Sequence, residues 1–258
     1  MKLLDLNQIG LQVSALGLGT VKFGRNTDIK YPAAFELPSD ENCKKLLSLA
    51  RDLGINLLDS APAYGESESR LGQLIKHDRQ YWKVCTKVGE IYDNQQSRYD
   101  FTPEYTETSV KQSMKRLGLD CLDLVLIHSD GNDLAIINQY GTLEKLNDLK
   151  AKGWIRGIGV STKTVDGGLA AIEKSDIVMI TYHAQYRDEE IVLDHAHQLG
   201  KGILIKKAFA SGHLKQSEIE QSLQLIFSHP AKCAAVIGTI NPVHLRANVE
   251  NALRAIKA

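Results

Sequence analysis

The chain has 258 residues, of which 43% are hydrophobic and 24% charged, and this balance excludes a disordered chain. Its 31 Lys and Arg residues match its 31 Asp and Glu residues, so it lacks the basic surplus that favours nucleic acid or anionic lipid. Neither a secretory signal nor an apolar run of roughly 18 residues is present, which predicts a cytoplasmic protein with reduced cysteines and without membrane or nucleic-acid partners.

Eight short runs rich in Val, Ile and Leu recur along the chain, and each is too brief for a helix. Such runs are typical of strands buried on both faces of a parallel sheet. In chain order they cover residues 13–20, 55–59, 82–87, 122–128, 155–160, 177–181, 202–206 and 234–238. Two long loops are expected at the same end of the molecule, over residues 23–38 after the first strand and 89–101 after the third.

Segments with helical periodicity and helix punctuation lie between these runs. Ser39 begins one that stops at Gly54, Thr102-Pro103 begins one that stops at Gly118, and Asn241-Pro242 begins the last. Further helical segments are predicted around residues 141–152, 165–174, 188–199 and 217–228. Eight strands alternating with eight helices predict an α/β protein, a (β/α)8 TIM barrel in one domain over residues 1–258. A doubly wound open sheet is the alternative, but the chain lacks a G-x-G-x-x-G turn after its first strand.

Ionisable side chains end three consecutive predicted strands. Asp59, Lys87 and His128 close the second, third and fourth runs, and Tyr64 follows Asp59 on a short loop. Because the carboxyl ends of barrel strands meet around one opening, we expect these four side chains to converge there. Each of them alone has an ordinary structural explanation, such as a helix cap or a charge at the rim, but four together indicate a site.

This set of side chains suits proton donation to a carbonyl oxygen. A free tyrosine has a pKa of about 10. A neighbouring lysine ammonium stabilises the phenolate and so lowers that pKa. A carboxylate such as Asp59 keeps the lysine charged, and a neutral histidine orients the carbonyl. No side chain of this group is a hydride source, so a nicotinamide cofactor would have to supply the hydride.

At these residues the chain resembles the aldo-keto reductase family. Residues 56–72 (NLLDSAPAYGESESRLG) resemble the family signature D-x-A-x-x-Y-G-x-S-E. The strands LDLVLIH at 122–128 and GIGVS at 157–161 resemble two further family strands. AVIGT at 235–239, with Asn241-Pro242 and Asn248, resembles the closing cofactor segment. The motifs occur in the family order and cover nearly the whole chain.

The resemblance implies a metal-independent reductase of small-molecule aldehydes or ketones that uses NADPH, with NADH possible. By position, Tyr64 would be the proton donor, Lys87 its pKa-lowering partner, Asp59 the partner of Lys87, and His128 the residue that orients the substrate. The cofactor would contact Thr20, Ser161, Thr162, Met179, Lys206, Phe209, Gly238, Thr239, His244 and Asn248.

Several of these cofactor positions depart from the family pattern. Thr162 stands where asparagine is common, Met179 where a glutamine often binds the carboxamide, and Lys206 where an aromatic ring stacks on nicotinamide. His244 occupies the place of an arginine that binds the 2′-phosphate in NADP-preferring relatives. Lys206 could face the cofactor or point out of the barrel end, and its position at a strand end favours the cofactor.

Two other functions are compatible with the same residues. One is a nucleotide-binding redox sensor or interaction module with little turnover, for which Met179 and Lys206 leave room. The other is a phosphosugar isomerase barrel, which would leave Tyr64 and Lys87 without a role. The physiological substrate and the oligomeric state are left open by the sequence.

Overall fold

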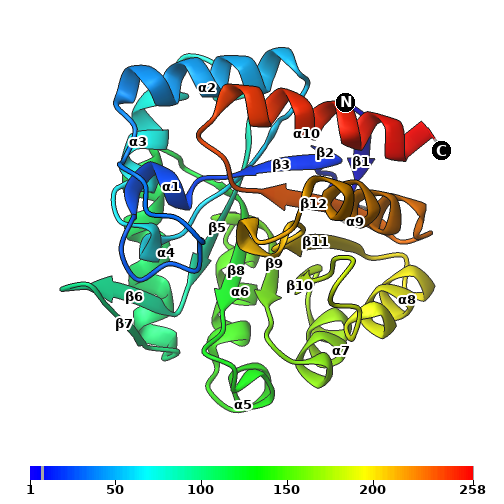
Figure 1. The fold of residues 1–258 in the computed structure, drawn as a ribbon. Coiled ribbons are helices and arrows are strands. Elements are labelled where there is room, and N and C mark those ends of the chain that lie inside the picture. The colour runs from blue at the N-terminus through cyan, green and yellow to red at the C-terminus, as the bar shows by residue number, and fades with distance from the viewer. Residues whose placement is uncertain (7–8, 258) are drawn as a thin grey trace.

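A closed barrel of eight parallel strands forms the centre of the computed structural model, which describes residues 1–6 and 9–257 (Figure 1). The strands follow one another around the barrel in chain order, and β12 pairs with β3 to close it, with Ala235 opposite Leu16. This closure confirms the predicted (β/α)8 TIM barrel and excludes the open sheet. The barrel strands are β3 (Leu16–Gly19), β4 (Leu57–Asp59), β5 (Lys83–Val88), β8 (Leu122–His128), β9 (Ile155–Ser161), β10 (Ile177–Thr181), β11 (Gly202–Lys206) and β12 (Lys232–Ile237).

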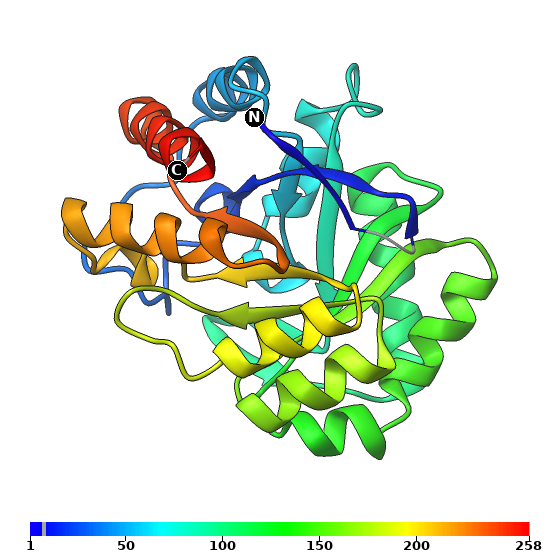
Figure 2. The same ribbon diagram turned by 90° about the vertical axis from the view of Figure 1, so that its right-hand side faces the viewer.

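Helices surround the barrel and cover the outer faces of its strands (Figure 2). The predicted caps are present: the Ser39 side chain accepts a hydrogen bond from Asn42 N, and that of Thr102 accepts one from Tyr105 N. Gly118 ends its helix in the left-handed conformation. The helices are α1 (Val21–Gly24), α2 (Asp40–Asp52), α3 (Ser67–Leu74), α4 (Pro103–Leu117), α5 (Asp133–Asn138), α6 (Thr142–Ala151), α7 (Val165–Lys174), α8 (Glu190–Gln198), α9 (Gln216–Ser228) and α10 (Pro242–Lys257).

An antiparallel hairpin of β1 (Leu3–Asp5) and β2 (Gln12–Ser14) covers the end of the barrel where the strands begin. Leu6, Leu11 and Val13 from this hairpin pack with barrel-interior side chains such as Leu57. The predicted first strand over 13–20 is wrong in one respect. The strand is interrupted at Ala15, and its two parts are β2, in the hairpin, and β3, in the barrel. Since the hairpin fills this end, the carboxyl end of the strands is the one free for a site.

The segment 89–101 is predicted to be a loop, and it instead forms a second antiparallel hairpin. Its strands are β6 (Glu90–Asp93) and β7 (Gln96–Tyr99). Asn94 and Gln95 join them with φ of 46° and 62°, the left-handed turn geometry that matches the twist of a two-residue hairpin. The loop over 23–38 begins with the last two residues of α1 and is otherwise irregular.

Candidate active site

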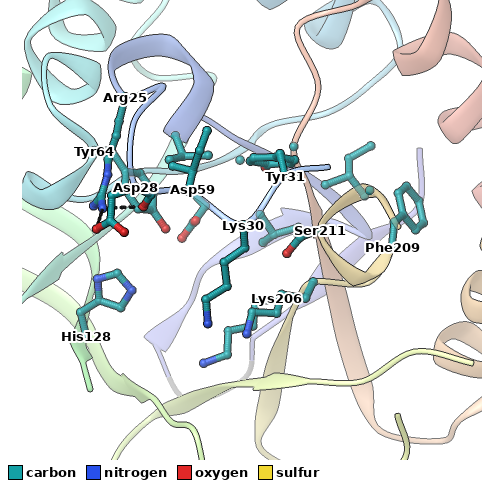
Figure 3. A pocket seen from close by; sticks show the side chains of 18 of the residues that line it. Arg25, Asp28, Lys30, Tyr31, Asp59, Tyr64, His128, Lys206, Phe209 and Ser211 are labelled. Carbon is teal, nitrogen blue, oxygen red and sulfur yellow. Dashed lines mark hydrogen bonds and ion pairs between the residues drawn. The ribbon is translucent and has the colours of Figure 1, made fainter. Parts of the chain in front are cut away.

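A cavity of about 810 Å³ opens at the carboxyl ends of the barrel strands (Figure 3). Asp59, Tyr64 and His128 line it, together with residues of the 23–38 loop, the β6–β7 hairpin and the segment after β11. Because parallel barrel strands end at one rim, side chains from separate strands reach a common space there. The structure thus brings the predicted catalytic positions together.

Lys87 lies beneath this cavity as a buried ammonium. Its Nζ donates to Asp59 Oδ1 at 2.6 Å and to the Ser60 carbonyl at 2.8 Å, and its side chain is only 1% exposed. Burial, the largest single influence, lowers the pKa of Lys87, but Asp59, Tyr64 and Cys85 together outweigh it and hold the pKa above its ordinary value. Lys87 is therefore charged at neutral pH.

Tyr64 ends the short 3-10 helix η2 (Pro62–Tyr64), which turns the chain back over the barrel. Lys87 Nζ lies 4.9 Å from the centroid of its ring. Burial raises the pKa of Tyr64 more than the Lys87 charge lowers it, so the pKa lies above the usual value near 10. The expectation that Lys87 brings this pKa down towards neutrality is wrong for this structure, because burial dominates. Tyr64 consequently holds its proton at neutral pH, as a proton donor must.

His128 meets Tyr64 edge to face, with 6.1 Å between the ring centroids. On its other side, His128 Nδ1 lies 2.7 Å from Glu90 Oε2. Burial lowers the pKa of His128, and although Glu90 opposes this, the net pKa falls below the usual value. The ring is therefore mostly neutral at pH 7, the state that suits orientation of a carbonyl.

Glu90, which lies in the segment predicted as a long loop, is a further side chain of the site that is not among those predicted from the sequence. The carboxylate is held in place by Ser97, whose hydroxyl donates at 2.6 Å, and by Arg25, whose Nη1 lies 3.5 Å away. Arg25 also donates to the Ala63 carbonyl, next to Tyr64. A carboxylate two residues beyond a barrel strand is the signal that could have identified it.

The buried Glu90 carboxylate predicts a specific loss of stability in acid. Burial raises its pKa, but His128, Ser97 and Arg25 overcome burial and bring the pKa to about 2. Since this lies below the ordinary 4.5, ionised Glu90 stabilises the fold fully above roughly pH 4.5, and that contribution is lost as the pH falls towards 2.

Glu90→Gln should therefore unfold at lower urea than the wild type at pH 7, and the difference should shrink between about pH 4.5 and pH 3. Urea titrations at several pH values measure this change. Glu36→Gln, at an exposed position, serves as the control. Parallel stability curves for the wild type and Glu90→Gln over the acid range would contradict the assignment.

The predicted cofactor residues separate into those that reach the cavity and those that do not. Lys206, Phe209 and Gly238 line it, and Lys206 Nζ donates to Ser161 Oγ at 3.0 Å and to the Thr162 carbonyl. Two others lie elsewhere: Thr20 Oγ1 is bonded to the Asp59 carbonyl and Ser67 Oγ, while Met179 packs in the barrel interior.

The expected phosphate side lies where β12 ends and α10 begins. Thr239 Oγ1 accepts from Asn241 N at 3.1 Å, and Asn241 Oδ1 caps α10 by accepting from Val243 N at 2.8 Å. His244 and Asn248 lie on α10 and are not among the cavity-lining residues, whereas Gly238 is.

The described residues fit the nicotinamide end of a dinucleotide at one point. Thr162 Oγ1 is buried and has no hydrogen-bond partner within the described ranges, and a carboxamide beside Ser161 could satisfy it. At Gly238 a Cβ would strike the Tyr31 hydroxyl, so this glycine accommodates a side chain of the protein itself. Met179 does not contribute a polar contact, because its side chain is in the core.

His195 and His197, which are two residues apart on α8, do not form part of a metal cluster. His195 Nε2 lies 2.5 Å from Glu173 Oε1. Over residues 1–6 and 9–257, no group of three or more His, Cys, Asp or Glu side chains is arranged to hold a metal ion. Over the same ranges no helix has both the length and the apolar character required to cross a bilayer.

Known proteins with similar sequences or structures point to one family. A putative aldo-keto reductase from Pseudomonas aeruginosa superposes with a TM-score of 0.91 at 46% identity, covering 98% of this chain and 95% of that one. An aldo-keto reductase from Bacillus halodurans in its holo form, at 23% identity and a TM-score of 0.80, shares the fold and covers all of this chain and 95% of its own. The D-threo-aldose 1-dehydrogenase of a Pseudomonas species is 30% identical over 81% of this chain and 70% of its own length. Residues 15–257 match the model of the aldo/keto reductase family, and the chain therefore belongs to that family.

Proposed function

We propose that this protein is a nicotinamide-dependent carbonyl reductase in which Tyr64 donates the proton. The observation that carries this proposal is the meeting of Tyr64 and His128 in one cavity with the buried Lys87–Asp59 pair beneath them. Membership of the family supports an oxidoreductase of small carbonyl compounds. A phosphosugar isomerase is the less suitable function, because that reaction gives the Lys87–Asp59 pair no role.

In the proposed reaction, these side chains deliver a proton to the carbonyl oxygen. A bound nicotinamide would supply the hydride to the carbonyl carbon. Tyr64 holds its proton until charge develops on the oxygen, and then transfers it from the phenol hydroxyl. The Lys87 ammonium stabilises the phenolate that remains, and Asp59 keeps this ammonium charged and oriented. His128 fixes which lone pair of the oxygen faces Tyr64.

On the cofactor side, we assign Ser161, Thr162 and Gly238 to the dinucleotide. NADPH is the first choice, because His244 stands where NADP-preferring relatives have an arginine and a histidine can donate a hydrogen bond to a 2′-phosphate. NADH is the second, because His244 lacks the planar fork with which arginine binds that phosphate. A relative named NADH-specific methylglyoxal reductase, from Escherichia coli K12, is 30% identical over 64% of this chain and 53% of its own length, which keeps NADH in consideration.

The function is tested by following the absorbance of NADPH and of NADH with a panel of aromatic and aliphatic aldehydes. We expect several aldehydes to accelerate oxidation of at least one cofactor. If the protein binds either dinucleotide but no carbonyl accelerates its oxidation, and no alcohol or sugar reduces the oxidised form, the enzyme proposal fails. The binding module would then be the better description.

A further inference from the structure

The cavity is electrically unlike the rest of the chain. The protein as a whole has equal numbers of basic and acidic residues. The cavity, in contrast, is lined by five basic and three acidic side chains. Its basic side chains are Arg25, Lys30, Lys163, Lys206 and Lys207, and its acidic ones are Asp28, Asp59 and Glu90.

All three acidic side chains already have cationic or histidine partners of their own. Asp59 is bound by Lys87 at 2.6 Å, and Asp28 is bound by Arg25 at 2.8 Å. Glu90 lies 2.7 Å from His128 and 3.5 Å from Arg25. None of these carboxylates is therefore free to neutralise the lysines of the cavity.

The four cavity lysines, Lys30, Lys163, Lys206 and Lys207, form a group that we call the lysine cluster. They come from three separate places: the 23–38 loop, the segment after β9, and the end of β11 with the residue after it. Among the described residues, no carboxylate oxygen lies within 4.0 Å of any of the four ammonium nitrogens. Lys163 Nζ contacts the Asp130 carbonyl at 3.1 Å and Lys206 Nζ contacts Ser161 Oγ, and both acceptors are neutral.

The lysines also repel one another. Burial lowers the pKa of Lys207, and the charges of Lys30 and Lys163 lower it further. Burial brings the pKa of Lys206 to about 7, with Lys207 and Lys163 adding to the effect and Glu189 and Asp133 opposing it. Burial in turn raises the pKa of Glu189, the largest of the opposing influences on Lys206. An anion placed among these ammonium groups would relieve the repulsion.

The cluster shares its cavity with Tyr64 and His128, the side chains that we assign to the carbonyl. The charge of Lys206 contributes to lowering the pKa of His128, so the two side chains are electrostatically coupled. Lys163 is bound to the carbonyl of Asp130, two residues beyond His128, and lies over the ring of Tyr99. Figure 3 shows Lys30 and Lys206 extending into the same part of the cavity, between His128 and the segment that carries Phe209 and Ser211.

We propose that the lysine cluster binds an anionic group on the substrate, so that the preferred substrates are aldehydes or ketones bearing a carboxylate or a phosphate. This proposal rests on the proposed reductase function, and it goes beyond it by naming the substrate class. The pyrophosphate of the cofactor has the same chemistry. We assign the cluster to the substrate because its lysines line the same cavity as Tyr64 and His128, and Lys163 is bound to the carbonyl of Asp130, two residues beyond His128, whereas the expected phosphate side is where β12 ends, at Gly238 and Thr239.

The test compares two aldehydes that differ in charge, 4-carboxybenzaldehyde and its neutral methyl ester. The wild type should reduce the acid with a kcat/KM at least about tenfold higher, which corresponds to roughly 1.4 kcal/mol. Raising NaCl from about 50 to about 300 mM should reduce this preference, since salt screens charges at the cavity mouth. Equal kcat/KM for the two aldehydes would overturn the proposal while leaving the reductase function intact.

Variants then assign the preference to the cluster. Lys30→Gln/Lys207→Gln changes two exposed positions, without any risk to the barrel core, and should remove most of the preference by lowering kcat/KM for the acid, with the value for the ester little changed. Lys206→Met should also reduce the preference, but because Lys206 Nζ binds Ser161 and Thr162, which we assign to the dinucleotide, this variant is read only as the ratio of acid to ester. Lys45→Met, a surface lysine that is 70% exposed on α2, is the control and should keep the full preference.

Binding measurements separate the substrate from the cofactor and from the chemistry. The dissociation constant of NADPH, measured by fluorescence, should change less than threefold in Lys30→Gln/Lys207→Gln. If this variant loses NADPH affinity but keeps the preference for the acid, the anion is the cofactor pyrophosphate and the proposal is wrong. If no aldehyde is reduced, the relative affinities for the acid and the ester, measured by calorimetry, still decide whether the cluster binds the anion.

Discussion

Tyr64→Phe should lower turnover of any carbonyl substrate by roughly 10²- to 10⁴-fold, the usual contribution of a positioned general acid. The substitution removes only the hydroxyl that we assign as the proton donor. The ring would still pack against Lys87 and His128. Its centroid lies 4.9 Å from Lys87 Nζ and 6.1 Å from the centroid of the His128 ring. Because the dinucleotide is assigned to other residues, its dissociation constant should be nearly unchanged. Stopped-flow reduction and fluorescence titration of NADPH measure the two quantities.

The matched control is Tyr140→Phe, which removes a phenol hydroxyl from an exposed ring stacked on Phe101 outside the cavity. Its turnover should equal that of the wild type. Turnover in Tyr64→Phe that equals the wild type would remove Tyr64 from the mechanism. A large loss of NADPH affinity in Tyr64→Phe would instead move its role from the proton to the cofactor.

Lys87→Met should have the second large effect, on stability as well as on activity. Lys87 and Asp59 form an ion pair at 2.6 Å with 1% and 7% of their side chains exposed. Removing one partner leaves the other as an unpaired buried charge, which costs about 3–5 kcal/mol of the free energy of unfolding. The variant should also lose turnover, because the phenolate of Tyr64 loses its cation. Urea unfolding and steady-state kinetics measure the two losses.

The double variant Asp59→Asn/Lys87→Met distinguishes these two roles of the pair. Neutralising both partners removes the unpaired charge, so the free energy of unfolding should recover most of its loss while turnover does not recover. Lys45→Met, which breaks an exposed pair with Glu41 at 2.7 Å, should change stability far less. A double variant no more stable than Lys87→Met would show that the pair does not act through charge compensation.

Local patterns in the sequence determined the barrel and the catalytic positions. Strands buried on both faces have to be apolar along their length, so their runs are visible without a structure. Helix ends have unsatisfied backbone groups, which Ser39, Thr102 and Gly118 satisfy through local chemistry. Asp59, Lys87 and His128 could be placed together because each ends a strand, and all strand ends of a closed barrel meet at one rim.

Contacts between distant segments could not be derived in this way. The partnership of Glu90 with His128 joins residues 38 positions apart, and it depends on a β6–β7 hairpin whose turn residues, Asn94 and Gln95, are not a glycine-containing turn. Met179 could face a cofactor or the barrel interior, depending on how far along its strand it lies from the carboxyl end. The pattern of apolar residues does not reveal this position, and the structure places Met179 in the interior.

The amino-acid sequence by itself determined the fold, the family resemblance and the convergence of four candidate side chains, because these follow from local periodicity, from short motifs and from positions at or just after strand ends. Only the tertiary structure decided the electrostatics. Burial raises the pKa of Tyr64 against the charge of Lys87, and four lysines from three separate segments share one cavity within a chain of zero net charge. Burial and charge proximity are set by the folded chain as a whole, since Coulomb energies depend on distances and local dielectric that no linear pattern contains.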